Sequence, residues 1–597
     1  MTQNAPRAFR TLNCAVPGPF DAGWARSLSG VDEKPTKGEA VGRVIGTEDS
    51  TPLEFWAAVG PNQFLQLDDV VALERTLPGG DSVEIYGVVT QVRARHEGAR
   101  FDSDVFLISE GVLPAERVEA ARILTTRYEP EVFVPPLPGS EVRKARGEER
   151  ERALFFEGMT SRVPAGLSRS DEPFYINLEF LDGTRGAHVN ISGVSGVATK
   201  TTYAMFLVNA VFQSGVFGVE GQHNKALVFN VKSEDLMYLD QPNVKLKPEQ
   251  ASRYRSLGLE PAAFPSVEFW APPRPGDRNA APWTERRHPG VGSFFWTIHE
   301  FCRDDLLQFL FADVSDERQQ YPMVVHAVMA QLRKARKLDD GAVVIEGKTI
   351  HVFDELVRFI ADRLEDEETK DFWGGRAIGQ GTLNAFIRRL YGAVPHLKNL
   401  IRSDVPNPAA HAIARQKQVT VVDIHNLNQR AQRFVVGVVL YRMFQTKEEA
   451  GTRLPLEFIV LDEMNKYAPR EGSSPIKEIL LDVAERGRSL GMILLGAEQT
   501  ASEVERRIVA NAAIRVVGRL DSAEAGRDEY GFLPVVQRQR ATIMKPGTMI
   551  VSQPELPVPM VVEFPFPSWA TRADEAPPPT VRGGTDSDPF EGMAPED

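Results

Sequence analysis

A glycine-rich turn followed by a Lys-Thr pair, in AHVNISGVSGVATKTTYAMF over residues 187–206, has the residue types that bind phosphate. The apolar run before the turn predicts the end of a strand, and a helix is expected to begin at the pair. Backbone N–H groups of the turn, the ammonium of Lys200 and the positive end of that helix can meet an anion, and the hydroxyl of Thr201 can meet a magnesium ion. The candidate nucleotide-binding residues are Gly193, Gly196, Thr199, Lys200, Thr201 and Thr202.

This loop departs from the usual phosphate-loop pattern at two positions. The pattern has its first glycine six positions before the lysine, where this chain has Val194, and a second glycine directly before it, where this chain has Thr199. Glycine turns between a strand and a helix are common in α/β folds. The stretch alone therefore fits a phosphate loop and an ordinary turn equally well, and a second motif has to decide.

The second motif is the apolar run Phe458–Leu461, which predicts a strand ending in Asp462 and Glu463. Ligands of a doubly wound sheet bind outside the carboxyl ends of its strands, so Asp462 can hold the water shell of a magnesium ion while Glu463 activates an attacking water. A charged helix cap after a buried strand is the plainer interpretation. Together with Lys200 and Thr201, the pair predicts a nucleoside triphosphatase. The next predicted strand, MILLGAEQ, ends at Gln499 beside Asp462.

The order of predicted elements gives an α/β fold with an N-terminal β-barrel and an inserted helical bundle, and the sheet domain with its phosphate-binding motifs resembles a RecA-like P-loop ATPase core. Short β-rich runs without helices between them indicate the barrel, and apolar residues at three- and four-residue spacing indicate the insertion. The expected parts are an arm (1–36), the barrel (37–140), the first part of the core (160–290), the helical insertion (291–412), the second part of the core (413–550), a closing ribbon (551–570) and a disordered acidic tail (571–597).

Two of these expectations concern short stretches. SDVFLI, at residues 103–108, is expected to be a strand of the barrel, and the insertion is expected to be all-helical. The densely charged stretch over 140–160 predicts a solvated connector between barrel and core.

Composition sets limits on the class of protein. The chain has 597 residues, 42% of them hydrophobic, which suffices for several cores, and its net charge of −13 argues against diffuse binding to nucleic acid. No apolar run is long enough for a membrane span and the N-terminus lacks a signal-peptide pattern, so we expect a cytoplasmic protein without membrane contact. The only cysteines, Cys14 and Cys302, suggest neither a disulfide framework nor a zinc site.

The order of parts resembles the HerA-type branch of the HerA/FtsK hexameric DNA translocases over roughly residues 37–570. The most specific part is 458–504, which contains VLDEMNKYAP and AERGRSLGMILLGAEQTASEV. Family members have here a strand ending in Asp-Glu, a helix ending in Gly-Arg, and a strand ending in Gln. The phosphate loop GVSGVATKT is the part least similar to the family.

The resemblance implies a homohexameric ring that hydrolyses ATP with Mg²⁺ between subunits and moves double-stranded DNA through a central channel. It also implies a NurA-type nuclease partner and a role in DNA end resection for double-strand break repair. On the matched positions, Lys200 and Thr201 bind phosphate and magnesium, Asp462 and Glu463 bind metal and activate water, and Gln499 is a polar sensor. Arg488 matches the arginine offered to the neighbouring subunit's γ-phosphate, with Arg486 as its rival; for an isolated arginine, a helix C-terminal cation is the plainer interpretation.

Basic residues near the carboxyl ends of predicted strands are candidates for a DNA channel. They are Lys232, Lys466, Arg470 and Lys477. Arg185, before the first strand of the core, is a further candidate for a subunit boundary. Surface cations more often have no specific partner, and no zinc finger, aromatic series or basic stripe accompanies these, so duplex DNA as substrate depends on the resemblance.

Three other functions stay open at this stage. One is a weakly or non-hydrolysing nucleotide-binding ring that serves as a scaffold for a nuclease, for example in phage defence; the intact Asp462-Glu463 pair disfavours it. Another is a rotary-type ATPase subunit, disfavoured by the helical insertion. The third is a ring translocase that moves protein or single strands.

Overall fold

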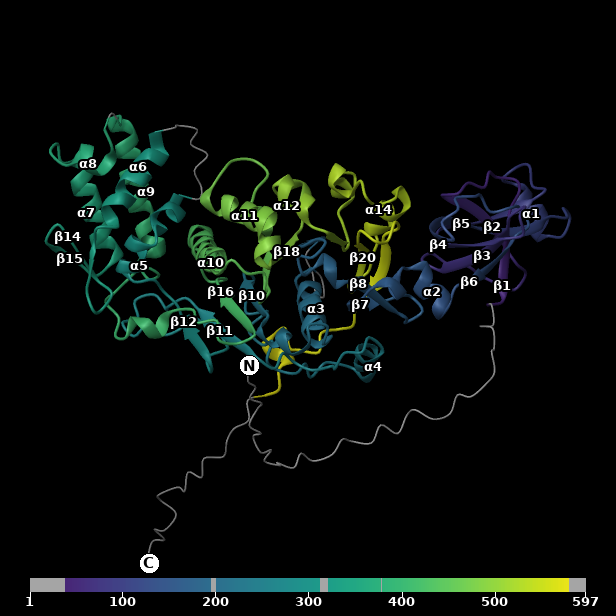
Figure 1. Cartoon of the computed structure of the whole chain (residues 1–597), viewed down its shortest axis with the longest axis horizontal. Helices are drawn as coiled ribbons and strands as arrows, with labels where there is room; N and C mark the ends of the chain where they lie inside the picture. Colours follow the sequence, from purple (N-terminus) through teal and green to yellow (C-terminus); the bar gives the residue numbers. More distant parts are fainter. Residues whose placement is uncertain (1–37, 195–199, 312–319, 377, 579–597) are drawn as a thin grey trace, which may run out of the picture. The chain divides into compact units, whose positions relative to one another are not determined.

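The computed structural model describes residues 38–194, 200–311, 320–376 and 378–578 (Figure 1). The chain divides into a short segment, Met1–Glu39, and one unit, Ala40–Asp597, to which all elements below belong. The arm expected over 1–36 lies outside the described residues, as do Gly196 and Thr199 of the phosphate loop. Among the described helices, none is both long enough and apolar enough to cross a membrane.

Six antiparallel strands close an N-terminal barrel, as the sequence predicted. Their order around the barrel is β1-β2-β5-β4-β3-β6, and alternate side chains of these strands fill its interior. The strands are β1 Ala40–Val44, β2 Glu54–Val59, β3 Val70–Thr76, β4 Ser82–Glu97, β5 Glu116–Glu129 and β6 Glu141–Lys144.

Two details of the barrel correct the sequence-based expectations. SDVFLI contributes to the helix α1 (Asp104–Ser109), whose first turn is stabilised by the Asp104 carboxylate accepting N–H bonds from Arg100 and Phe101. The stretch 140–160 is no solvated connector, because it contains β6 and the helix α2 (Glu148–Ala153). Its charges pair with one another and with the barrel: the buried Arg143 contacts Glu84 at 2.7 Å and Glu149 at 2.8 Å.

The core is a twelve-stranded sheet in the order β12-β11-β16-β10-β17-β18-β9-β19-β20-β21-β7-β8. The eight strands from β12 to β19 run parallel, and the other four form an antiparallel edge. The strands are β7 Arg162–Leu167, β8 Pro173–Asn177, β9 Val189–Ser192, β10 Lys225–Asn230, β11 Val267–Ala271, β12 Val291–Ser293, β16 Val419–Asp423, β17 Glu457–Asp462, β18 Met492–Glu498, β19 Ile514–Val517, β20 Thr548–Ser552 and β21 Met560–Glu563.

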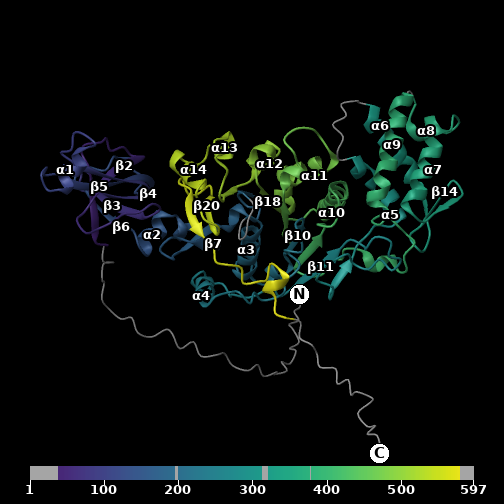
Figure 2. The same cartoon turned by 180° about the vertical axis from the view of Figure 1, so that it is seen from behind.

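Helices cover both faces of this sheet. Neighbouring side chains of each strand point to opposite faces, and because most of them are apolar, both faces have to be buried. Leu227 and Phe229 of β10 belong to the same core as residues of α10 and α11, whereas Ala226 and Val228 belong to the same core as residues of α3 and α4. Figure 2 shows these strands and helices from behind. The helices are α3 Lys200–Gln213, α4 Pro248–Ser256, α10 Gln429–Ala450, α11 Pro475–Leu490, α12 Arg506–Asn511, α13 Ser522–Ala525 and α14 Val535–Ala541. This confirms the α/β class with its barrel and inserted bundle.

The insertion is a helical bundle that also contains a small sheet, so it is not all-helical. The strands β13 (Arg336–Lys337), β14 (Val343–Ile345) and β15 (Lys348–Ile350) are antiparallel and too short to give a period-2 signal. The helices are α5 Ile298–Arg303, α6 Gln320–Leu332, α7 Phe353–Glu365, α8 Lys370–Gly374 and α9 Gln380–Leu397.

The expected tail begins as ordered structure. Glu575 is buried and accepts a hydrogen bond from the Asn243 amide at 3.2 Å, and its neighbour Asp574 pairs with Lys245 at 2.5 Å. Carboxylates that were expected to stay in solvent thus fix residues 571–578 against the core, and 579–597 lie outside the described residues. Where one domain ends and the next begins remains a prediction.

Candidate nucleotide-binding site

The candidate residues gather at the carboxyl edge of the parallel sheet. The adjacent strands β9, β18, β17 and β10 end in register, since Asp462 pairs with Ala497, Glu498 with Ser192, and Phe229 with Leu461. Residues that follow these strands are therefore neighbours in space.

The start of the phosphate loop is fixed by backbone contacts. Gly193 donates its N–H to the carbonyl of Glu498 at 3.1 Å, and Val194 donates to the carbonyl of Arg519 at 2.7 Å. A Cβ at Gly193 would come within 3.1 Å of the Arg519 oxygen, so this approach favours glycine.

Lys200 begins α3 and is almost entirely buried. Its Nζ donates to the carbonyl oxygen of Gly193 at 2.8 Å, at the carboxyl end of β9. Burial lowers the pKa of this ammonium, an effect that the charge of Asp462 opposes. Thr202 lies half-buried in the first turn of the same helix. An ammonium held at the carboxyl edge of the sheet in this way is placed to meet a phosphate.

Asp462 and Glu463 end β17 and are surrounded by hydrogen-bond donors. The Thr201 hydroxyl donates to Oδ2 of Asp462 at 2.7 Å, and Nζ of Lys232 lies 3.0 Å from the same oxygen. Lys232 also lies 3.5 Å from Oε1 of Glu463, whose other oxygen pairs with Lys466. Glu463 has φ = +57°, a left-handed backbone conformation that is uncommon for residues other than glycine. Both carboxylates are therefore neutralised within the chain.

Glu498 is a residue of this site that the sequence analysis missed. Its side chain is fully buried at the end of β18 and accepts the Ser192 hydroxyl hydrogen bond at 3.0 Å. Burial raises the pKa of Glu498 to about 8, although the Ser192 hydrogen bond and the charge of Lys200 oppose this. The expected sensor, Gln499, follows it directly and is exposed. Only the apolar run that encloses Glu498 could have indicated its burial.

The three arginines proposed for a subunit boundary lie at the opposite, amino edge of the sheet. Arg488, in the last turn of α11, donates to the carbonyls of Gly183 (3.1 Å) and Thr184 (2.7 Å), which precede β9. Arg486 pairs with Glu448, and Arg185 pairs with Glu179 at 3.0 Å and with Glu555 at 2.8 Å. Because the nucleotide-binding residues lie at the carboxyl edge, these arginines cannot reach the site of their own chain.

The four candidates for a DNA channel have different surroundings. Lys232 and Lys466 contact the carboxylates of the candidate site, and Arg470 is exposed and pairs with Glu529 at 3.0 Å. Lys477 is only 5% exposed, and its ammonium lies 2.7 Å from Glu505 and donates to two backbone carbonyls. The structure thus contradicts a DNA-facing role for Lys477, because its positive charge is needed inside the fold.

No protein-family model and no curated protein matches this chain. Several solved structures are similar in fold. VirB4 of Thermoanaerobacter pseudethanolicus is 14% identical, with 68% of this chain and 96% of that chain covered and a TM-score of 0.41. The unbound bacterial conjugative coupling protein TrwBΔN70 is 9% identical (71% and 93% covered, TM-score 0.43), and TrwB in complex with ADP and Mg²⁺ is 10% identical (67% and 89% covered, TM-score 0.42).

Proposed function

We propose that this chain is an ATPase that moves double-stranded DNA, and that it works as a homohexameric ring. One observation carries the ATPase part of the proposal. The Thr201 hydroxyl and the Asp462 carboxylate, 261 positions apart in sequence, lie 2.7 Å apart, next to Lys200 and Glu463. This is the set of groups that nucleoside triphosphate hydrolysis needs: a cation for phosphate, oxygen ligands for magnesium, and a base for water.

The residues present fit Mg²⁺ and ATP. A hydroxyl and a carboxylate side by side are hard oxygen donors, and Mg²⁺ is typically held by one or two such groups together with substrate phosphates. When bound, Mg²⁺ would offset charge on the phosphates during transfer. Thr201 and Asp462 would hold it, and Asp462 would exchange its contact with Lys232 for this role.

Each remaining group has a task that its position supports. Lys200 can turn from the Gly193 carbonyl oxygen, which carries no full charge, to the β- and γ-phosphates. Glu463 would take a proton from the attacking water once its contacts with Lys232 and Lys466 loosen. Gln499, exposed at the end of β18, would contact the water or the γ-phosphate.

The position of Arg488 at the amino edge of the sheet supports the proposal that the chain assembles into a ring. A guanidinium at the amino edge cannot stabilise charge at its own carboxyl edge, but in a head-to-tail ring one subunit's amino edge can face the next subunit's nucleotide. Arg488 would then act on the neighbour's γ-phosphate, with Arg486 as the alternative. The resemblance of residues 458–504 to HerA-type proteins extends the proposal to DNA end resection with a NurA-type nuclease.

A second function is favoured by one observation. Lys232 and Lys466 already neutralise Asp462 and Glu463, so the site is electrostatically satisfied without ligand. A ring with this site could bind nucleotide weakly, hydrolyse it slowly or not at all, and serve as a scaffold for a nuclease.

Steady-state ATP turnover with and without linear duplex DNA tests the proposal. We expect magnesium-dependent turnover that duplex DNA stimulates and that Glu463→Gln abolishes. Turnover that does not respond to duplex DNA would contradict the DNA motor, and the absence of turnover with retained nucleotide binding would favour the scaffold.

A further inference from the structure

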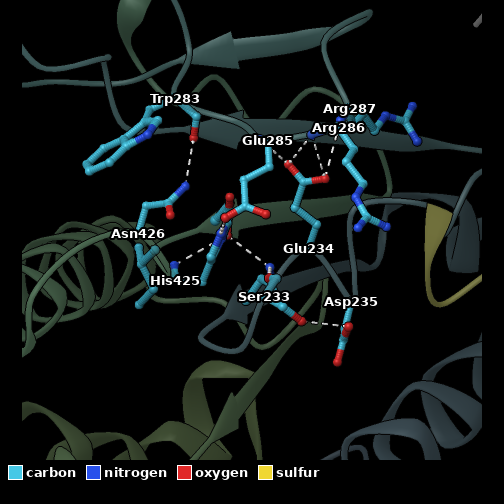
Figure 3. Close-up of polar contacts among 12 residues, drawn as sticks. Ser233, Glu234, Asp235, Trp283, Glu285, Arg286, Arg287, His425 and Asn426 are labelled. Atoms are coloured by element: carbon cyan, nitrogen blue, oxygen red, sulfur yellow. Dashed lines mark hydrogen bonds and ion pairs between the residues drawn. The ribbon is translucent and has the colours of Figure 1, made fainter.

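The segment 230–235, at the end of β10, contacts the candidate site with one side chain and a distant loop with another. Lys232 lies 3.0 Å from Asp462. Two residues further on, the Glu234 carboxylate accepts backbone N–H bonds from Glu285 (2.5 Å), Arg286 (3.0 Å) and Arg287 (3.3 Å), as Figure 3 shows. Hydrogen bonds to an ionised carboxylate are about twice as strong as neutral ones, so this contact holds the loop firmly.

The turn between these two side chains is itself fixed. The Asn230 amide donates to the carbonyl of Ser233 at 2.5 Å and to the carboxylate of Asp423 at 2.9 Å, and Ser233 has φ = +43°. Only Ser233 separates Lys232 from Glu234. The two side chains are thus joined by one fixed turn, so a displacement of Lys232 would also move Glu234 and the backbone of 285–287 that it binds.

A second connection joins the same loop to the sheet. Nδ1 of His425 lies 2.7 Å from the buried Asp423 carboxylate at the end of β16, and its Nε2 lies 3.9 Å from Glu285 (Figure 3). Burial alone would lower the pKa of His425, but its hydrogen bond to Asp423 and the nearby charges of Asp423, Glu285 and Glu234 raise it. A protonated His425 then attracts Glu285 and keeps the loop at the carboxyl edge.

We call residues 272–290, between β11 and β12, the arginine loop. Arg274, Arg278 and Arg286 are exposed, and none of them forms an ion pair within the described part of the chain. Arg287 differs from them. It binds Asp240 through two hydrogen bonds of 2.5 and 2.7 Å, and its guanidinium lies 4.2 Å from the ring centroid of Phe269. Arg287 therefore anchors the loop, while the other three guanidinium groups remain available to a ligand.

We propose that the arginine loop binds backbone phosphates of duplex DNA through Arg274, Arg278 and Arg286, and that segment 230–235 couples this contact to Asp462 and Glu463. The inference rests on the function proposed above. A guanidinium group can form two parallel hydrogen bonds to one phosphate (bidentate binding). It therefore suits a nucleic-acid backbone better than the ammonium group of a lysine does. Coupling is reciprocal: DNA on the loop affects the position of Lys232, and ligands of the carboxylates affect DNA affinity.

The salt dependence of duplex DNA binding tests the contact. Each lost phosphate contact should reduce the slope of log K against log salt by about 0.9, so the triple variant Arg274→Ala/Arg278→Ala/Arg286→Ala should reduce it by roughly 2 to 3. The charge-matched control is Arg255→Ala/Arg376→Ala/Arg388→Ala, at three exposed arginines outside the loop. We expect the control to keep the wild-type slope. An unchanged slope in the loop variant, or equal losses in both, would overturn the contact.

Glu234→Gln tests the coupling, because it removes the charge that holds the loop and leaves the three arginines in place. We expect duplex affinity within about threefold of wild type and DNA stimulation of ATP turnover reduced at least about fivefold. Glu234→Asp, which keeps the charge on a shorter side chain, should retain more stimulation and serves if the first variant does not fold. Full stimulation in both variants would overturn the coupling. A wild-type protein whose turnover ignores DNA would instead overturn the proposed function, so the two failures are distinguishable.

Discussion

The Nζ atom of Lys232 lies 3.0 Å from Oδ2 of Asp462, the oxygen that also accepts the Thr201 hydroxyl hydrogen bond. The Lys232 ammonium thus lies next to the pair of oxygens proposed to hold magnesium. Burial would lower the pKa of Lys232, but the charges and hydrogen bonds of Asp462 and Glu463 raise it, so the lysine stays charged. A magnesium ion that binds Thr201 and Asp462 therefore has to compete with the Lys232 ammonium.

Replacing Lys232 should therefore make the site bind magnesium more tightly. For Lys232→Met we expect the magnesium concentration that half-saturates ATP turnover to fall about threefold, because a partly exposed ion pair is worth at most about 1 kcal/mol and threefold corresponds to about 0.7 kcal/mol. Lys466→Met is the matched control, since Lys466 pairs with Glu463 and not with Asp462. Equal magnesium dependence in wild type and Lys232→Met would contradict this competition.

Glu463→Gln should bind ATP without cleaving it. The amide keeps the shape of the side chain but cannot accept a proton from water, and the loss of a general base costs about 10²- to 10⁴-fold in rate. Bound nucleotide can be counted after rapid filtration and its hydrolysis followed in a single turnover. Glu503→Gln is the control, because Glu503 lies near the same edge, where it accepts hydrogen bonds from Asn465 and Thr500. Wild-type cleavage by Glu463→Gln would exclude Glu463 as the base.

Glu498 should make stability fall with rising pH. In the unfolded chain this carboxyl ionises above about 4.5, whereas in the folded chain it stays protonated up to about 8. Between these values the unfolded state loses a proton that the folded state keeps, so the free energy of unfolding falls by about 1.4 kcal/mol per pH unit from this group. Glu498→Gln has no carboxyl at this position, so its stability lacks this dependence on pH. We expect the unfolding temperature of wild type, relative to Glu498→Gln, to fall between pH 5 and pH 8. Parallel curves for the two proteins would show that Glu498 does not titrate in this way.

Arg488 and Lys200 should complement each other between subunits. Lys200→Ala damages its own site, whereas Arg488→Ala, at the amino edge, damages the site of the neighbour. Each variant alone should be inactive, and mixed rings should regain part of the turnover wherever a Lys200→Ala subunit offers Arg488 to an Arg488→Ala subunit. Co-assembly is checked first with differently tagged chains. If Lys200→Ala regains turnover only when mixed with Arg486→Ala, then Arg486 is the residue that acts on the neighbouring site. If neither mixture regains turnover, no arginine of this pair acts between subunits.

The parts of the fold that sequence could predict are those with strong local patterns. The apolar strand ending in Asp462 follows from its hydrophobic run alone, and so does the next strand, which ends at Glu498, one residue before the predicted Gln499. The barrel was predicted as a class, but the helix Asp104–Ser109 was mistaken for a strand because its apolar residues are exposed and give no helical period.

The parts that sequence could not predict depend on long-range pairing. The strands β11 and β12 lie in a Pro- and Arg-rich stretch. β11 pairs with β16, which lies far along the chain (Val267 opposite Val419), and β12 in turn pairs with β11. In the same way, nothing in the sequence indicates that Lys232 lies beside Asp462, because only the order of the strands brings the two together. Nor does the sequence indicate that Lys477 is buried against Glu505. Residue type and spacing indicate which groups can do chemistry, but only the sheet order shows which of them meet.

ATP-dependent displacement of a third strand from linear duplex DNA tests the central claim most directly. A triplex-forming oligonucleotide bound to one end of a duplex is removed only by a protein that moves along the duplex, and neither DNA binding nor ATP hydrolysis alone has this effect. We expect displacement by wild type with ATP and Mg²⁺, none with ADP, and none by Glu463→Gln, which still binds nucleotide. DNA-stimulated ATP turnover without displacement under the same conditions would contradict the account of this chain as a DNA translocase.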